Sequence, residues 1–212
     1  GCKMPGDYTG DSMKQYDNMR PEKLYARILK QRESDGKNFF RRFHHLFVAV
    51  PCPACGGKGK PIFRKYGFSH QECTQCQTWY CSPRPTESLL FRYYTEFKTP
   101  TLWTKLLCST NQARKSLQYK PRVKLLVKML KKAGIKKGSI ALDVGAGSGA
   151  FALCLRQSGY FSKIYTCDLS KHCVDCCAAL GFQAIQGTIE DMKLSSVDVI
   201  CVNDVLEHLF NP

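Results

Sequence analysis

A glycine-rich turn between a strand and a helix is the feature that most constrains the fold. In "ALDVGAGSGAF" (residues 141–151), Gly145, Gly147 and Gly149 alternate directly after an apolar run. Glycine lets the chain turn tightly and lets a ligand approach the backbone and the positive end of the next helix. Strand and helix patterns alternate through residues 139–212, which is typical of a parallel sheet with helices on both faces. The sequence therefore predicts an α/β fold with a Rossmann-like parallel sheet.

Two carboxylates near this turn indicate what kind of ligand it could bind. The dinucleotide fingerprint is satisfied only in its loose form, by Gly145, Gly147 and Ala150. Asp143 lies two residues before Gly145, where it would repel a phosphate and attract a cationic amino group. Asp168 ends the next expected strand and can accept hydrogen bonds from ribose hydroxyls. S-adenosylmethionine fits this site, since it has a ribose and an amino group but no pyrophosphate.

With these residues the chain resembles the class I S-adenosylmethionine-dependent methyltransferases. Four segments carry the resemblance in the right order: "LDVGAGSGAF", "TCDLS", "GTIEDM" and "VDVICVNDVLEHLFNP". They look like that family's first motif, the acidic end of its second strand, its adenine-contacting loop, and its fourth strand with the start of the following helix.

The resemblance implies which residues contact the cofactor. They are Asp143, Gly145, Gly147, Asp168, Ile189, Glu190 and Asn203. The first three would line the methionine end, and Asp168 would hold the ribose. Ile189 and Glu190 would flank the adenine, and Asn203 would lie near the methionine through its backbone. Ile189 could instead be a core residue, Glu190 a surface acid, and the glycines could serve only a tight turn.

Two cysteine pairs predict a metal centre in residues 51–82. Cys52 and Cys55 form one C-x2-C pair, and Cys73 and Cys76 form a second pair after 17 intervening residues. This spacing matches a structural zinc site closed by four thiolates. The alternatives are four unrelated buried thiols or, less suited to a reducing compartment, disulfides.

The residues after the second pair extend the resemblance. "CQTWYCSPRP" is followed by Tyr93 and Tyr94 on an expected helix. A similar zinc-binding segment, Pro-Arg-Pro run and tyrosine-bearing helix occur in class I methyltransferases that include a group acting on nucleotide-linked sugars. This part of the resemblance implies a small-molecule acceptor.

The run "DVLEH" supplies a candidate catalytic group. His208 stands just after the fourth expected strand, and a histidine side chain can act as a general base near neutral pH. If the run is helical, Asp204, Glu207 and His208 share one face and could hold a divalent ion. Similar runs occur in quinone O-methyltransferases and small-RNA 2′-O-methyltransferases. Alternatively, Glu207 and His208 cap and pack the helix.

Charge is distributed unevenly along the chain. Residues 1–142 hold 28 Lys and Arg against 9 Asp and Glu, whereas residues 143–212 hold 4 against 8. Such asymmetry is consistent with a nucleic-acid partner or with solvated helix faces. There is no apolar run of 18 residues and no apolar signal core at the N-terminus, so we expect no membrane contact and a cytoplasmic location.

The sequence predicts four segments. They are a basic helical region (1–50), the zinc-binding segment (51–82), a helical connector (83–138) and a partial S-adenosylmethionine-binding domain (139–212). We expect a turn at Asp35-Gly36 and an amphipathic helix over 120–133. The chain stops at Pro212, as a helix is expected to begin, and this predicts a fragment without the last strands of the sheet.

These features support three hypotheses about function. The first is a methyltransferase acting at oxygen or carbon of a small molecule resembling a sugar or a quinone. The second is an RNA methyltransferase that uses the basic N-terminal half and the zinc segment to hold phosphates. The third is a zinc-stabilised binding module without catalysis.

Overall fold

A computed structural model describes residues 17–189, 192 and 196–210. These residues form two compact units. The first unit contains residues 104–205 and the chain up to residue 24, and the second contains residues 25–103 and the chain from residue 206.

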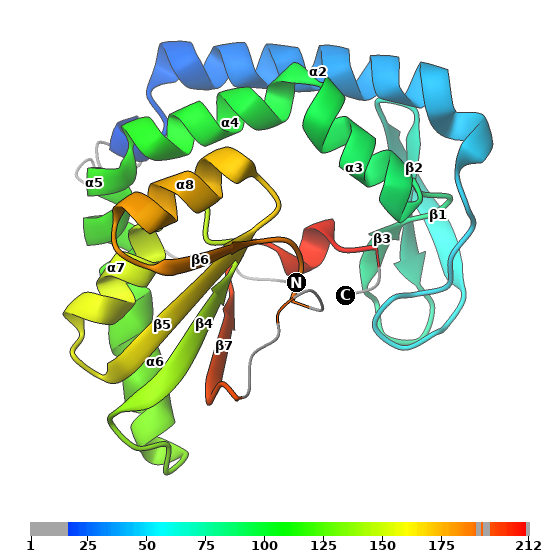
Figure 1. The fold of residues 1–212 in the computed structure, drawn as a ribbon. Coiled ribbons are helices and arrows are strands. Elements are labelled where there is room, and N and C mark those ends of the chain that lie inside the picture. The colour runs from blue at the N-terminus through cyan, green and yellow to red at the C-terminus, as the bar shows by residue number, and fades with distance from the viewer. Residues whose placement is uncertain (1–16, 190–191, 193–195, 211–212) are drawn as a thin grey trace. The chain divides into compact units, whose positions relative to one another are not determined.

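The first unit is built on a parallel sheet of four strands. They are β4 (Ser139–Val144), β5 (Phe161–Asp168), β6 (Gln183–Gln186) and β7 (Val199–Val202). The strand order is β6-β5-β4-β7, so the chain moves outward from β4 to β6 and then returns to the other side of β4 (Figure 1). The predicted α/β fold with a parallel sheet is confirmed.

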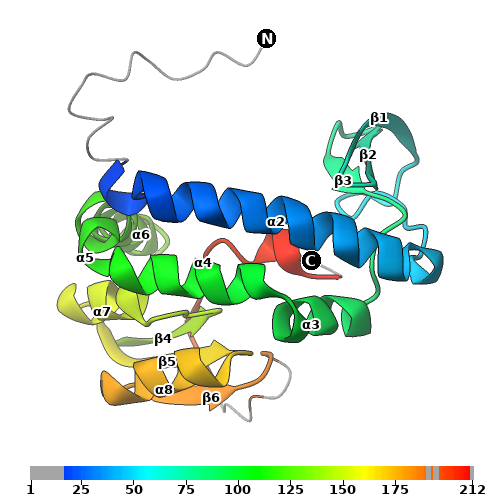
Figure 2. The same ribbon diagram turned by 90° about the horizontal axis from the view of Figure 1, so that it is seen from above.

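Three helices pack on one face of this sheet, α6 (Lys120–Lys132), α7 (Ala150–Gln157) and α8 (Lys171–Ala179) (Figure 2). Ala141 pairs with Ile164 on one neighbouring strand, and residues of all three helices join them in a single buried cluster. Helices on both faces were expected, and for the described residues this is wrong. Two successive right-handed crossovers in one direction, β4 to β5 to β6, place α7 and α8 on the same side.

α6 continues a helical segment that begins with α5 (Asn111–Arg114) and a π-helical turn, η2 (Lys115–Tyr119). Its predicted inward residues all contact the core of the first unit: Val123, Leu126, Val127 and Leu130. The helix ends at Lys132, and Gly134, two residues later, has φ 77° and donates its N–H to the carbonyl of Lys131. The amphipathic prediction is confirmed because the apolar stripe follows the helical repeat.

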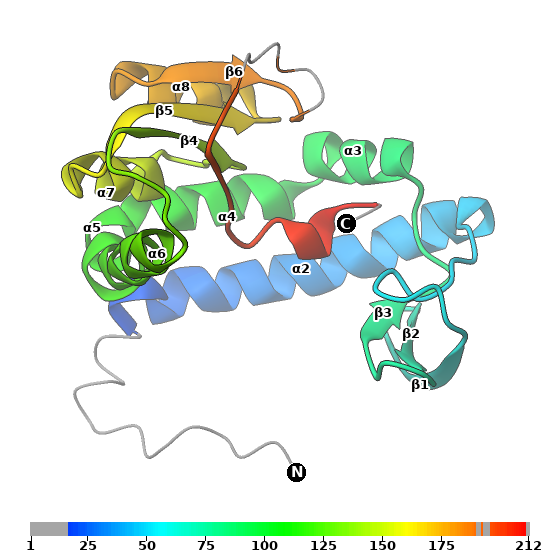
Figure 3. The ribbon, with the colours of Figure 1, turned by 90° about the horizontal axis from the view of Figure 1, so that it is seen from below.

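The second unit contains a small antiparallel sheet, β1 (Gly59–Lys65), β2 (Phe68–Cys73) and β3 (Trp79–Cys81), with β2 in the middle (Figure 3). Its helices are α2 (Glu22–Phe43), the short η1 (His44–Leu46), α3 (Glu87–Glu96) and the start of α4 (Lys98–Ser109). Phe39 lies at the centre of an aromatic cluster that also holds Phe43 and Phe97. No helix in the described ranges is long and apolar enough to cross a membrane.

The turn expected at Asp35-Gly36 is wrong, because α2 runs through it without a break. Asp35 is 6% exposed, and its side chain accepts hydrogen bonds from Gln31 at 2.8 Å and from the N–H and hydroxyl of Thr99 at 2.8 and 2.7 Å. It thus satisfies a free N–H in the first turn of α4. Gly36 packs closely against Tyr66, since a Cβ there would lie 3.1 Å from the Tyr66 ring and the ring would have to shift by a few tenths of an ångström.

Asp35→Ala should therefore destabilise the chain by about 2–3 kcal/mol, because it leaves two buried donors of Thr99 without an acceptor. Urea denaturation measures this loss. Glu33→Ala is the matched control, since Glu33 lies on the same helix in an exposed pair with Lys37 and such pairs contribute about 0.3–0.5 kcal/mol. Equal losses in the two variants would contradict the role given to Asp35.

Candidate cofactor site and metal centre

The glycine turn leaves β4 in a conformation that ordinary side chains rarely adopt. Gly145, Gly147 and Gly149 have φ values of 66°, 55° and 74°. The N–H groups of Gly145 and Ala146 both donate to the carbonyl of Cys167 on β5, at 2.9 and 3.1 Å. The turn is thus fixed to the neighbouring strand, and its alternating glycines serve the backbone path directly.

Two of these glycines also lie against other parts of the first unit. A Cβ on Gly145 would come within 2.5 Å of Val205, and one on Gly149 within 2.9 Å of Leu180. A Cβ on Gly147 would meet nothing within 4 Å. The middle of the turn is therefore open to a ligand, while both sides of it are packed.

Asp168 holds the turn from the end of β5. Its Oδ2 accepts the N–H of Gly147 at 2.9 Å, and its Oδ1 accepts the N–H of Ser170 at 2.8 Å. Its backbone carbonyl also accepts the N–H of Gly187, at 3.1 Å. Each carboxylate oxygen has a further lone pair, so the half-buried group can still accept from a ligand hydroxyl.

Asp143 is a buried carboxylic acid with an unsatisfied oxygen. The residue is 2% exposed, and Oδ2 has no hydrogen-bond partner among the described residues. Burial, and then the charge of Asp168, raises the pKa of Asp143 to about 8, while the backbone N–H of Ala152 acts in the opposite direction. An unpaired buried carboxyl is costly. This geometry therefore fits a ligand that brings a cation or a donor to Oδ2.

The carboxyl ends of β4 and β7 form the point where the strand order reverses. Asp143 pairs with Cys201 in the sheet, so the end of β7 lies beside the glycine turn. Asn203 follows β7 directly and is half-buried. Open α/β sheets bind ligands at such reversal points. The structure thus brings Asp143, Gly145, Gly147, Asp168 and Asn203 to one edge of the sheet.

The loop expected to flank an adenine is described only in part. Ile189 is 38% exposed, so the alternative that it is a core residue is wrong. Its carbonyl accepts the N–H of Met192 at 3.2 Å. Glu190 lies outside the described residues.

The run from Asp204 to His208 does not form the expected helical face. Asp204 has φ 55° and lies outside the short helix η3 (Leu206–His208). Its carboxylate lies 3.4 Å from Arg122 of α6, and it belongs to the first unit, whereas Glu207 and His208 belong to the second. The left-handed residue interrupts the helix, so the predicted i, i+3, i+4 arrangement of the divalent-ion site is not present.

His208 is exposed and lies beside a tyrosine of the second unit. Its ring meets the Tyr94 ring edge-on, with 6.4 Å between the ring centroids. Burial raises the pKa of Tyr94, and Tyr93 and Glu207 add to the shift. The structure therefore places His208 next to one of the two tyrosines of α3 that follow the Pro-Arg-Pro run.

The four cysteines of the second unit come together. The sulfur atoms of Cys52, Cys55, Cys73 and Cys76 all lie within 4.8 Å of one another, and they are the group among the described residues that could hold a metal ion. Cys52 and Cys76 are 3.5 Å apart, as are Cys55 and Cys73. Four sulfurs around one tetrahedral zinc would be roughly 3.8 Å apart. The spacing and the donor set thus fit such an ion.

Both cysteine pairs sit on tight turns of the same kind. Gly56, just after the first pair, has φ 73°, and Gln77, just after the second, has φ 61°. The N–H of each donates back to the carbonyl of the first cysteine in its pair, at 2.8 and 3.1 Å. Hydrogen bonds from Thr78 lower the pKa of Cys76 to about 6, which favours the thiolate that a metal binds.

The C-terminal third of the chain matches a known protein family. Residues 142–212 match a family model described as "Methyltransferase domain". This segment is therefore similar to part of a methyltransferase domain. The match begins inside β4 and contains the glycine turn, Asp143 and Asp168. The resemblance found in the sequence is therefore confirmed for this segment.

Other comparisons add little about the acceptor. No curated protein matches the chain. One similar solved structure is a protein from Pyrococcus horikoshii, provisionally described as an RNA methyltransferase, with 22% identity and a TM-score of 0.32. The alignment covers 39% of this chain and 42% of that one. A TM-score of this size does not establish a common fold.

Sequence reasoning missed some residues of the methyltransferase segment. Thr166 pairs with Asp143 across the sheet, is 1% exposed, and its hydroxyl lies within hydrogen-bonding reach of the Cys177 thiol. Val205 closes over Gly145. In the sequence, Thr166 looks like any other residue of a buried strand. The contact between Val205 and Gly145 depends on the strand order, which no local pattern indicates.

Proposed function

We propose that this chain carries the cofactor site of an S-adenosylmethionine-dependent methyltransferase. One observation carries the proposal: a buried carboxyl group, Asp143, has an unpartnered oxygen at the carboxyl end of β4, beside an open glycine turn. The ammonium of a bound methionine moiety would supply the missing partner. The family match of residues 142–212 supports the same assignment.

The remaining residues of the site fit the other parts of this cofactor. Asp168 would accept the ribose hydroxyls through its spare lone pairs while it still holds Gly147. Gly147 would allow close backbone approach, since its surroundings are open. Ile189, Glu190 and the backbone of Asn203 keep their proposed roles at the adenine and at the methionine. When bound, the cofactor supplies an activated methyl group, and the protein chiefly aligns the acceptor.

The acceptor that we propose is a hydroxyl or a carbon acid of a small molecule resembling a sugar or a quinone. Support comes from the four-cysteine segment and the tyrosine-bearing helix that follows it, which resemble segments of enzymes of that kind. His208 would accept the proton of the acceptor, and Tyr94, which contacts its ring, would help to orient it.

Cofactor binding tests the role of Asp143 directly. Asp143→Asn keeps the shape of the side chain and an acceptor for the N–H of Ala152, but it cannot become anionic. We expect it to weaken S-adenosylmethionine binding by roughly ten- to a hundredfold, the loss of one charge-assisted hydrogen bond. Binding of 5′-methylthioadenosine, which has the same adenine and ribose but no amino acid, should be unchanged. Calorimetry measures both affinities.

Two further variants complete this test. Asp168→Asn should weaken both ligands, because both carry the ribose. Asp175→Asn, an exposed carboxylate on α8 paired with Lys171, should change neither affinity. If Asp143→Asn weakened both ligands equally, or neither, the assignment of the ammonium to Asp143 would be wrong.

We also propose that the four-cysteine cluster binds zinc in a structural role. Four thiolates leave no open position for a substrate. The metal would stabilise a small sheet whose own buried cluster contains little besides Cys52, Cys73, Tyr80 and Val50. Binding energies of this type are on the order of 10 kcal/mol and are coupled to folding.

Zinc content and thermal stability test this second proposal. The chain should bind about one zinc ion per molecule, and Cys73→Ser should lower both the zinc content and the melting temperature. Cys81→Ser is the control, because Cys81 is on the same sheet but outside the cluster. A chain that kept its zinc after Cys73→Ser, or that lost it after Cys81→Ser, would contradict the assignment.

A second candidate function is methylation of RNA. The observation in its favour is the charge of the chain before the methyltransferase segment, where 28 basic residues stand against 9 acidic residues. Between residues 101 and 139 there are eleven basic residues and no acidic one. Charge of this kind attracts any polyanion and would therefore give the chain affinity for RNA. It does not identify the atom that is methylated.

A further inference from the structure

The two faces of the β1–β3 sheet carry different side chains. On one face Tyr80 is 7% exposed and packs against Cys52 and Cys73, while Arg64 of the same face is exposed. The other face consists of two neighbouring cross-strand rows. Its residues are Phe63, His70 and Cys81 in one row, and Lys60, Glu72 and Trp79 in the next. We call these six residues the open face of the sheet.

An irregularity in β1 brings Lys60 and Phe63 to the same side. The pairing register shifts between Pro61 and Phe63, so Lys60 faces Glu72 while Phe63 faces His70. In a regular strand, residues three apart point to opposite faces. The bulge removes this alternation and adds a basic residue to an aromatic surface. Lys65, two residues beyond Phe63, pairs with Phe68 and lies on the same side.

The aromatic rings of the open face contact one another but remain accessible. Phe63 stacks on His70, with 4.4 Å between the ring centroids and 11° between the planes. Trp79 meets Phe63 edge-on at 6.0 Å. Trp79 is nevertheless 65% exposed and Phe63 43% exposed. Large rings held in place by each other and left open to solvent are suited to stack on a flat ligand.

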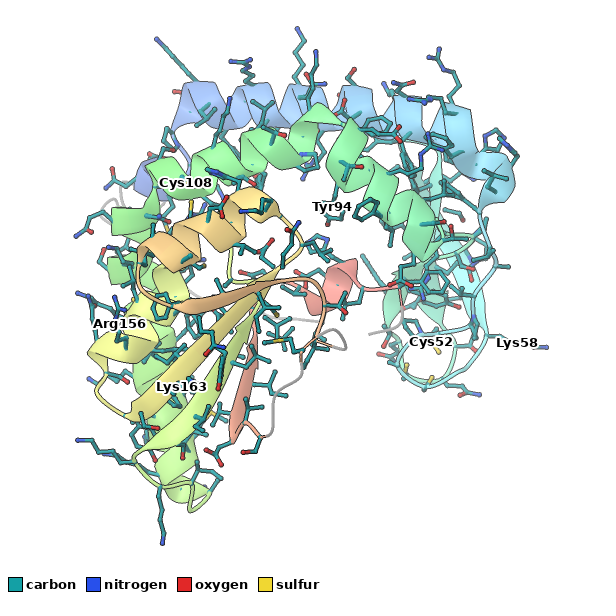
Figure 4. The ribbon with its side chains drawn as sticks, viewed as in Figure 1. Cys52, Lys58, Tyr94, Cys108, Arg156 and Lys163 are labelled. Carbon is teal, nitrogen blue, oxygen red and sulfur yellow. The ribbon has the colours of Figure 1, made fainter. Side chains whose placement is uncertain are left out.

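The charge around these rings is positive. Between residues 58 and 81 there are four basic residues and one acidic residue, Glu72. Glu72 forms an ion pair with Lys60 at 3.1 Å. No carboxylate of the described residues forms an ion pair with Lys58 or Lys65, and the Lys58 side chain extends outward from the sheet (Figure 4). The Lys65 ammonium lies over the Tyr66 ring, 5.5 Å from its centroid. Exposed rings with such lysines beside them suit a ligand that has both flat bases and phosphates.

We propose that the open face binds single-stranded nucleic acid, with bases stacked on Trp79 and Phe63 and phosphates near Lys65 and Lys58. A single strand is required because a duplex keeps its base faces stacked on each other. All the residues of this binding site belong to the second unit. It does not depend on methyl transfer, and it holds whether the methyl acceptor is a small molecule or RNA.

Binding of labelled oligonucleotides tests this site. The intact chain should bind a 12-residue oligouridylate or oligothymidylate more tightly than an RNA duplex of equal length. Trp79→Leu should weaken binding of the single strand about tenfold, by loss of base stacking, and Phe63→Leu should have a similar effect. The two oligonucleotides also show whether RNA or DNA is preferred. Quenching of Trp79 fluorescence on binding should remain in Trp103→Phe and disappear in Trp79→Phe.

Matched controls separate this site from general charge and from misfolding. Phe91→Leu removes a ring that is 57% exposed on α3 and should leave the affinity unchanged. When the logarithm of the binding constant is plotted against the logarithm of salt concentration, Lys65→Gln should reduce the steepness of the slope by about 0.7. Arg64→Gln, on the opposite face, should leave the slope unchanged. All variants should keep the metal content and S-adenosylmethionine affinity of the unaltered chain.

Two results would overturn the proposal. One is equal binding of duplex and single strand that Trp79→Leu and Phe63→Leu leave unchanged, because this would show attraction by charge alone. Another is binding of polyglutamate to the open face without binding of oligonucleotides, because the partner would then be an acidic protein. Loss of S-adenosylmethionine binding with intact oligonucleotide binding would contradict the proposed methyl transfer and leave this site standing.

Discussion

The buried carboxyl group of Asp143 is the constraint on which the account of the first unit depends. Asp143 is the last residue but one of β4 and is buried. It accepts a hydrogen bond from the N–H of Ala152 in the first turn of α7, and it lies close enough to Asp168 for their charges to repel. A buried carboxyl group with a strongly perturbed pKa marks a candidate ligand site. The glycine turn, fixed to β5 by the carbonyl of Cys167 and by Asp168, leaves an open approach beside this carboxyl group.

The two units are stabilised in different ways. The first has one apolar cluster between a parallel sheet and three helices. The second divides its burial between an aromatic cluster around Phe39 and a smaller cluster next to the four cysteines. A sheet as small as β1–β3 has little apolar area of its own, so a bound metal would contribute much of its stability. This leaves one face of that sheet free to carry exposed rings.

Much of this arrangement could be predicted from local patterns. The strand and helix periods predicted β4 to β7 and α6, and the C-x2-C spacing predicted the cysteine cluster, because each depends on residues close together in sequence. Three features could not be read in this way. Asp35 and Gly36 resemble a turn, but a tertiary contact with Thr99 keeps them helical. The side on which α7 and α8 pack depends on strand order. The bulge that aligns Lys60 with Phe63 exists only in the paired strands.

The number of protons released when S-adenosylmethionine binds tests the central claim most directly. With a pKa of about 8, Asp143 is mostly protonated at pH 7 in the free chain and must ionise to pair with an ammonium group. Calorimetry in two buffers of different ionisation enthalpy should therefore show release of close to one proton at pH 7, declining as the pH rises above 8. Binding with no proton release at pH 7 would contradict the pairing of Asp143 with the ammonium.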